Sequence, residues 1–180
     1  MNWIKRGRLM GGLIISMAFV SANADISAMP AWDLSEESHD VSQASFSSAM
    51  SEAQTMARLH LDRFFLHVID TEGRGRADAA VKVAVPVDGT MVEAIWITPF
   101  AEFDGQFIGI LANDPQSLSD LGQGDAIMFD ASQVRDWYFF GRDGKMYGSY
   151  TTRAMLPALE PAEAAEIAAL LSSDPLPFGW

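Results

Sequence analysis

Residues 79–100, AAVKVAVPVDGTMVEAIWITPF, contain the pattern that decides the fold. Val81, Val83 and Val85 alternate with other residues, which is typical of a strand with one buried face. A second apolar run follows the turn dipeptide Asp88–Gly89. Two such runs joined by Asp-Gly predict a β-hairpin.

Further short apolar segments follow this hairpin along the chain. Asp104–Gly105 leads into QFIGILA, and GQGD precedes AIMF. DWYFF and KMYGSY then flank the dipeptide Asp143–Gly144. About six short strands with local turns predict a mainly antiparallel sheet or a small half-barrel.

Helical patterns lie on both sides of these strands. Pro161, with Glu160 and Glu163 around it, predicts the start of a short C-terminal helix. A longer helix is predicted over residues 47–69, because apolar residues recur there at three- and four-residue steps: Met50, Ala53, Ala57, Leu61, Phe64 and Val68. The economical interpretation is one α+β domain over residues 46–180.

The first 24 residues have the pattern of an export signal. A basic start with Lys5, Arg6 and Arg8 precedes an apolar run, and Ala22 to Ala24 supply the small residues of a cleavage site. The apolar run is shorter than the ~20 residues of a membrane-spanning helix. We therefore expect cleavage after Ala24, a periplasmic protein with no membrane attachment, and a flexible acidic lead-in over residues 25–45.

Composition narrows the possible functions. The chain has no cysteine, which excludes disulfides, cysteine nucleophiles and thiolate metal sites. Its formal net charge is −12, and loss of three basic residues with the signal lowers this to −15. Such a charge disfavours nucleic acid and anionic lipid as partners and leaves a basic protein as one alternative. We expect a monomer.

The histidines do not predict a metal site. His60 and His67 are seven residues apart, so on a helix they lie about 10 Å apart along the axis. Two histidine ligands of one zinc ion on a helix are normally three or four residues apart. We expect neither a metal nor a cofactor.

Three carboxylates next to apolar segments are the remaining candidates for chemistry. Glu93 lies in an apolar strand on the face of Ile95 and Ile97, where a buried carboxylate with a raised pKa could act as a general base. The alternative is a Glu93 that reaches solvent or pairs with Arg153. Asp125 and Asp136 stand where carboxylates cap turns and strand starts.

The segments EAIWI, GILANDP, GD (Gly124–Asp125) and RDW occur in this order along the chain, after the helical segment ARLHLDRF. Together they resemble the pattern of the bacterial domain-of-unknown-function family 2314, over residues 50–156. Two positions depart from its pattern: Ala94 replaces a histidine and Ala126 an apolar residue, so chemistry that needs that histidine is not open to this chain. The resemblance implies a fold and no activity. The matching residues are Glu93, Trp96, Gly109, Leu111, Asn113, Pro115, Gly124, Asp125, Phe129, Asp136, Trp137, Gly148, Thr151 and Arg153.

The stretch LANDP, residues 111–115, has two interpretations. In the first interpretation the stretch is a structural turn. Asn113 and Asp114 can hydrogen-bond nearby backbone groups, and Pro115 ends strand pairing. In the second, a polar pocket for a small polar or cationic ligand forms where side chains converge. Its residues would be Trp96, Asn113, Asp125, Asp136 and Trp137.

The leading functional hypothesis is a non-enzymatic binding module of the cell envelope that takes a protein or a small molecule. A small enzyme with Glu93 or Asp136 as general base is the alternative. An acidic inhibitor that neutralises a basic protein is a third hypothesis.

Overall fold

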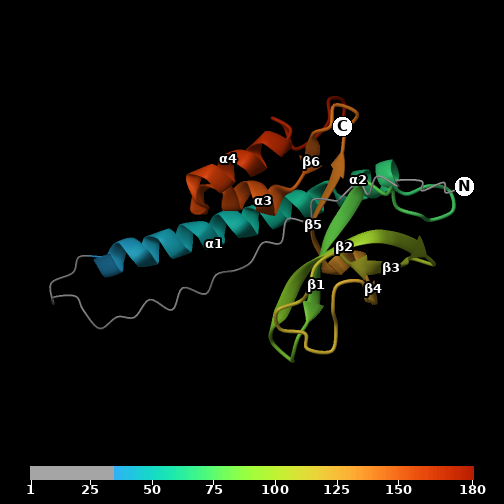
Figure 1. Cartoon of the computed structure of the whole chain (residues 1–180), viewed down its shortest axis with the longest axis horizontal. Coiled ribbons are helices and arrows are strands. Elements are labelled where there is room, and N and C mark those ends of the chain that lie inside the picture. Colours follow the sequence, from blue (N-terminus) through green and yellow to red (C-terminus); the bar gives the residue numbers. More distant parts are fainter. Residues whose placement is uncertain (1–34) are drawn as a thin grey trace, which may run out of the picture.

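The computed structural model describes residues 35–180, with side chains from residue 43 onward. The expected signal peptide and residues 25–34 of the expected lead-in lie outside the described residues. The described chain is an α+β domain in which N-terminal helices cover a six-stranded antiparallel sheet (Figure 1). The predicted fold class is confirmed, and the sheet is open rather than a half-barrel.

The predicted N-terminal helix is present as two helices. α1 (Ser35–Leu59) and α2 (Leu61–Val68) are separated by His60. α1 begins twelve residues earlier than predicted and includes part of the range assigned to the lead-in, because residues 35–46 lack the apolar repeat that marks the rest. The apolar repeat itself is confirmed from Ala53 on, since that stripe is buried: Ala53, Ala57, Leu61, Phe64 and Val68.

Six strands occur along the described chain, between the turns that the sequence predicts. The Asp104–Gly105 turn has positive φ angles at both residues (52° and 79°), as a tight hairpin of the primed type requires. The six strands are β1 (Ala79–Pro86), β2 (Val92–Phe103), β3 (Gln106–Leu111), β4 (Ala126–Phe129), β5 (Val134–Phe140) and β6 (Met146–Gly148).

The spatial order of the strands is β4-β3-β2-β1-β5-β6. The β1–β2 hairpin is therefore central. β3 and β4 extend the sheet beyond β2, and β5, which follows them in the chain, pairs with the free side of β1. Residues alternate between two faces of the sheet. One, the core face, packs against α1 and α2. The opposite one is called the outer face below, and it includes Lys82, Trp96, Tyr138 and Ile108.

Short helices complete the fold beyond β6. Tyr150, expected at the end of a strand, instead begins α3 (Tyr150–Met155), which lies along α1 (Figure 1). α4 (Pro161–Leu170) starts at the predicted proline. Two single-turn 3₁₀ helices, η1 (Ala131–Gln133) and η2 (Leu156–Ala158), precede β5 and follow α3.

Trp137 is the centre of the core. Its indole is 0% exposed and stacks on Phe64 of α2 with ring centroids 4.8 Å apart. Its Nε1 donates a hydrogen bond of 2.8 Å to the carbonyl oxygen of Ala57 in α1. One side chain of β5 thus contacts both N-terminal helices. Trp180, near the end of the chain, packs against Phe139 beside it.

The close approach of Gly148 to Trp137 gives a test of this packing. Gly148 and Gly144 both have φ of +73°, which favours glycine. A Cβ on Gly148 would lie 2.3 Å from the Trp137 carbonyl oxygen, whereas nothing lies within 4 Å of one on Gly144. Gly144→Ala should lower the free energy of unfolding by about 1 kcal/mol. Gly148→Ala should lower it by about 3 kcal/mol or more, measured by urea denaturation. Equal losses would contradict the packing.

Candidate functional site

Asp136 is buried in β5 and binds the start of α3. Its Oδ1 accepts hydrogen bonds from the backbone N–H groups of Trp137 (2.8 Å) and Tyr150 (3.1 Å). Its Oδ2 accepts from the N–H (2.8 Å) and the hydroxyl (2.6 Å) of Thr151. Burial raises the pKa of Asp136, and the bonds from Thr151 and Trp137 oppose that shift. The carboxylate caps a helix from a neighbouring strand.

Glu93 has a comparable role at the other end of the sheet. Its two carboxylate oxygens accept hydrogen bonds from the backbone N–H groups of Gln116 (2.6 Å) and Ser117 (2.8 Å). These residues follow Pro115 in the β3–β4 loop. Glu93 is half-buried and does not pair with Arg153, which donates instead to the carbonyl oxygens of Gly148 and Ser172. Glu93 therefore fixes the loop to β2.

The LANDP stretch forms a turn with its own polar network. The Asn113 amide donates to the carbonyl oxygen of Asp114 (3.2 Å), and the Asp114 carboxylate accepts from the N–H of Gln123 (2.8 Å). Asp125 is exposed and accepts from the N–H of Gly122 (2.7 Å). These contacts support the structural interpretation of the stretch.

The structure does not bring the five predicted pocket residues together. Asn113 and Asp125 lie in the loop between β3 and β4, whereas Asp136 and Trp137 lie on β5, three strands from β3. Both β5 side chains are 0% exposed, so neither lines an open pocket. Trp96 is half-buried on the outer face.

A row of three side chains crosses the centre of the outer face. In the strand register Lys82 of β1 is opposite Trp96 of β2 on one side and Asp136 of β5 on the other. The Lys82 Nζ lies 5.5 Å from the centroid of the Trp96 ring. The ammonium donates a long hydrogen bond, 3.5 Å, to the Thr151 hydroxyl. Trp96 therefore already faces a cation.

Burial alters the ionisation of this row. It lowers the pKa of Lys82, an effect that the nearby Asp136 charge opposes. Tyr138, whose ring lies 5.0 Å from that of Trp96 in an edge-to-face arrangement, has its pKa raised by burial. Lys82, Trp96 and Tyr138 thus form a half-buried cationic and aromatic cluster, called the Lys82 cluster below.

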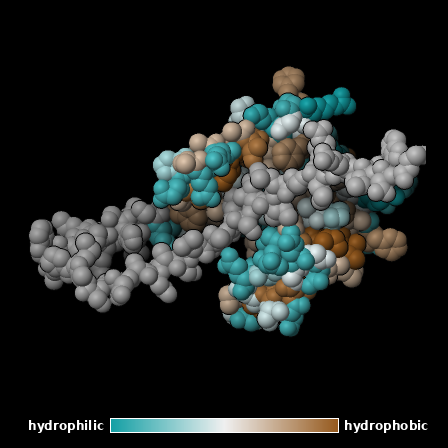
Figure 2. Space-filling model, viewed as in Figure 1, coloured by the Kyte–Doolittle hydropathy of each residue, from teal (hydrophilic) through white to brown (hydrophobic). Residues whose placement is uncertain are grey.

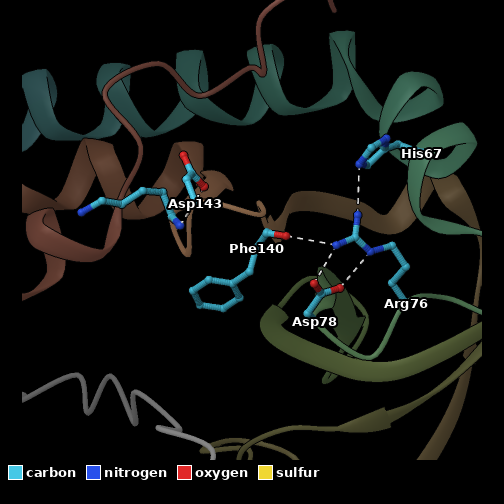
Figure 3. A network of polar contacts seen from close by, with 6 residues as sticks. His67, Arg76, Asp78, Phe140 and Asp143 are labelled. Carbon is cyan, nitrogen blue, oxygen red and sulfur yellow. Dashed lines mark hydrogen bonds and ion pairs between the residues drawn. The ribbon is translucent and has the colours of Figure 1, made fainter.

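A second polar network connects α2 to the segment that precedes β1 and to β5 (Figure 3). Arg76 donates two hydrogen bonds to Asp78, at 2.9 and 2.6 Å, and a third to the carbonyl oxygen of Phe140 at 3.1 Å. Its Nη1 lies 3.1 Å from Nε2 of His67. Burial, and then the Arg76 charge, lower the pKa of His67. A neutral His67 accepts this bond, so the network fastens the end of α2.

Two further features concern the described part of the chain alone. Among the side chains of residues 43–180, no group of three or more histidines, aspartates and glutamates could hold a metal ion. The second feature concerns the helices of residues 35–180: none of them has the length and apolar character to cross a bilayer.

Comparison with known proteins identifies the family. Residues 47–171 match the model of the DUF2314 family, described as an uncharacterised protein conserved in bacteria. The chain belongs to this family. An uncharacterised protein of Escherichia coli K12, YegJ, is 31% identical over 123 residues, which cover 68% of this chain and 77% of YegJ.

A Neisseria meningitidis protein named as a putative ankyrin repeat protein is also similar. It is 34% identical over 80 residues, which cover 44% of this chain and 31% of that protein. No solved structure matches the chain.

The residues that carry the DUF2314 resemblance have architectural roles in this structure. Glu93 and Asp136 accept backbone hydrogen bonds, and Trp137 fills the core. Gly148 allows the close approach of β6 to Trp137. In this chain these motif residues therefore hold the fold together, and the Lys82 cluster includes only one of the motif residues, Trp96.

Sequence reasoning missed Lys82 and Tyr138. A signal for Lys82 was present, because it is the one charged residue in the strand AAVKVAVP and falls opposite the face of the buried valines. The sequence does not mark Tyr138 in this way, because the family motif at this point consists of its neighbours Asp136 and Trp137.

The Asp136 contacts predict a large cost for an amide at this position. Asp136→Asn places two N–H donors where four donors already converge, so at least one buried group loses its partner. The free energy of unfolding should fall by about 2 kcal/mol or more in urea denaturation. Asp125→Asn is the control, because its amide oxygen can still accept from Gly122, and should change stability by less than about 1 kcal/mol. A loss at Asp136 no larger than at Asp125 would contradict the capping role.

Proposed function

We propose that the protein is a non-enzymatic binding module of the bacterial cell envelope that takes an extended, basic polypeptide segment along the free edge of its sheet. The observation that carries the proposal is β4. It pairs with β3 on one side, and no strand of the described residues pairs with its other side. An unpaired edge offers backbone donors and acceptors to a further strand.

Apolar side chains stand on the outer face beside this edge. Ile108 of β3 is directly opposite Met128 of β4, and these side chains are 48% and 64% exposed. Phe103, at the end of β2, is 76% exposed. Figure 2 shows hydrophobic residues gathered next to hydrophilic ones over the part of the molecule that contains β2, β3 and β4. An added strand could bury these side chains with its own alternate residues.

The charge around the edge specifies the chemistry of the partner. Residues 83–134, which include β2, β3 and β4, contain eight aspartates and glutamates and no lysine, arginine or histidine. Asp104, Asp125 and Asp130, at the ends of these strands, are exposed. A segment that alternates apolar and basic residues would complement both the side chains and the charge. Because the proposed partner is basic, the same charge complementarity also supports the third hypothesis, in which this protein is an acidic inhibitor of a basic protein.

The enzyme hypothesis receives less support from the geometry. Asp136 has no exposed surface, and each of its oxygens accepts two hydrogen bonds. Both oxygens of Glu93 accept backbone N–H groups. A general base needs an oxygen within reach of a substrate proton, and here that would require the loss of structural bonds.

A pair of synthetic peptides tests the proposal. A labelled acetyl-KVKVKVKV-amide should bind saturably in fluorescence anisotropy, and acetyl-EVEVEVEV-amide should not. The double variant Ile108→Ser/Met128→Ser should weaken binding at least about tenfold, through loss of apolar contact and not of charge. Leu66→Ser is the matched control, because Leu66 is an 84% exposed apolar residue of α2 away from the edge.

Binding of the acidic peptide with equal affinity would refute the charge argument. An unchanged affinity in the double variant would place any binding elsewhere on the molecule.

The envelope location rests on the N-terminal pattern of basic, apolar and small residues. Mass spectrometry of the periplasmic fraction should find a mature chain that begins at Asp25. Recovery of the full-length chain from the membrane fraction instead would overturn this part of the proposal.

A further inference from the structure

Lys82 is a cation in a poorly compensated position. Its side chain extends from the central strand β1 and is half-buried between Trp96 and the start of α3. An ammonium group has three donors, and the hydrogen bond that Lys82 makes within the described residues is long, 3.5 Å to the Thr151 hydroxyl. No carboxylate of the described residues lies within 4.0 Å of it as an ion pair. Pairing with an anion would lower the free-energy cost of this half-buried charge.

Asp136 acts on this charge through space and forms no ion pair with Lys82. The Thr151 hydroxyl contacts both groups: it lies 3.5 Å from the Lys82 Nζ and donates to Asp136 Oδ2 at 2.6 Å. Both Asp136 oxygens are engaged with donors of the Trp137, Tyr150 and Thr151 segments. The Lys82 ammonium is therefore next to a carboxylate that already has its full set of hydrogen bonds.

The ring of Trp96 lies beside the ammonium on the outer face, and a second ring, that of Tyr138, packs against Trp96. The ring of Tyr138 meets that of Trp96 at 60°, with centroids 5.0 Å apart, and both side chains are half-buried. The ring of Phe140 continues the row, 5.9 Å from that of Tyr138. A flat apolar group placed against these rings would bring an attached anionic group to Lys82.

We propose that the Lys82 cluster is a binding site for a small aromatic carboxylate. The carboxylate pairs with the Lys82 ammonium, and the flat ring packs against Trp96 and Tyr138. A single negative charge fits best, because one ammonium faces the ligand while the chain as a whole carries a net charge of −12. This reverses the ligand charge expected from Trp96 and the neighbouring carboxylates in the sequence, since Lys82 already occupies the cation position at Trp96. The site is separate from the β4 edge, so it stands or falls independently of the peptide-binding proposal.

Three probes distinguish the contributions of charge and ring. Indole-3-acetate has both, tryptamine keeps the ring and reverses the charge, and acetate keeps the charge without the ring. Isothermal titration calorimetry should show indole-3-acetate binding at least about tenfold more tightly than either of the others. The indole N–H signal of Trp96, assigned in an NMR spectrum by its loss in Trp96→Phe, should shift on addition of indole-3-acetate.

Lys82→Met removes the charge and keeps a long unbranched side chain. It should weaken indole-3-acetate binding at least about tenfold. Lys145→Met is the matched control, because Lys145 is the other lysine of the described residues and donates to Ala169 on a different surface. The control should bind as the unaltered protein does. Lys82→Gln, which keeps a polar group and removes the charge, should lose affinity in the same way and serves if the methionine variant does not fold.

The proposal is overturned if tryptamine or acetate binds as tightly as indole-3-acetate, or if no saturable binding occurs. It is also overturned if both Lys82 variants bind normally, because Lys82 would then be a structural residue that stabilises Thr151 and Asp136 alone.

Discussion

The buried carboxylate of Asp136 is the interaction on which the rest of the structure depends. It joins β5 to α3 through the backbone N–H groups of Tyr150 and Thr151 and the Thr151 hydroxyl, and it also accepts the N–H of Trp137 within β5. The next residue, Trp137, fills the core and binds α1 through Ala57. Asp136 and Trp137, two consecutive residues of β5, thus fix the positions of α3 and of the N-terminal helices relative to the sheet. An ionisable group at such a point is costly unless its partners are complete, and here they are.

The carboxylates of Glu93 and Asp136 have the same structural role, which is to accept hydrogen bonds from backbone N–H groups. Glu93 fixes the β3–β4 loop through two backbone N–H groups, as Asp136 fixes α3. Both belong to the motifs of the DUF2314 family. Motif residues in a family of unknown function are easily taken for catalytic residues. In this protein their contacts are those of supports for the backbone.

The two open surfaces differ in chemistry because of where the basic residues stand. From residue 83 to residue 134 the chain has no basic residue, so β2, β3 and β4 themselves carry only apolar, neutral polar and acidic groups. Arg58 and Arg135 reach Ser132, just beyond β4, from outside this stretch. Lys82 immediately precedes this stretch and lies on the central strand. The two proposed sites therefore differ in charge: the strands at the β4 edge carry acidic and apolar side chains, whereas the central strand carries a half-buried ammonium beside an aromatic ring.

The sequence by itself determined the elements of this protein. Alternating valines, Asp-Gly turns and the apolar repeat from Ala53 on act over a few residues, so the strands, most turns and the helix at Pro161 were predictable. The unmarked start of α1 and the change from strand to helix at Tyr150 were not, since neither has a local apolar signal. Only the tertiary structure decided which distant residues meet. The insertion of β1 between β2 and β5 separates Asn113 and Asp125 from Asp136, and it places Lys82 between Trp96 and Asp136. Strand order and register are set by packing of the whole sheet against α1 and α2, and no short stretch of sequence encodes them.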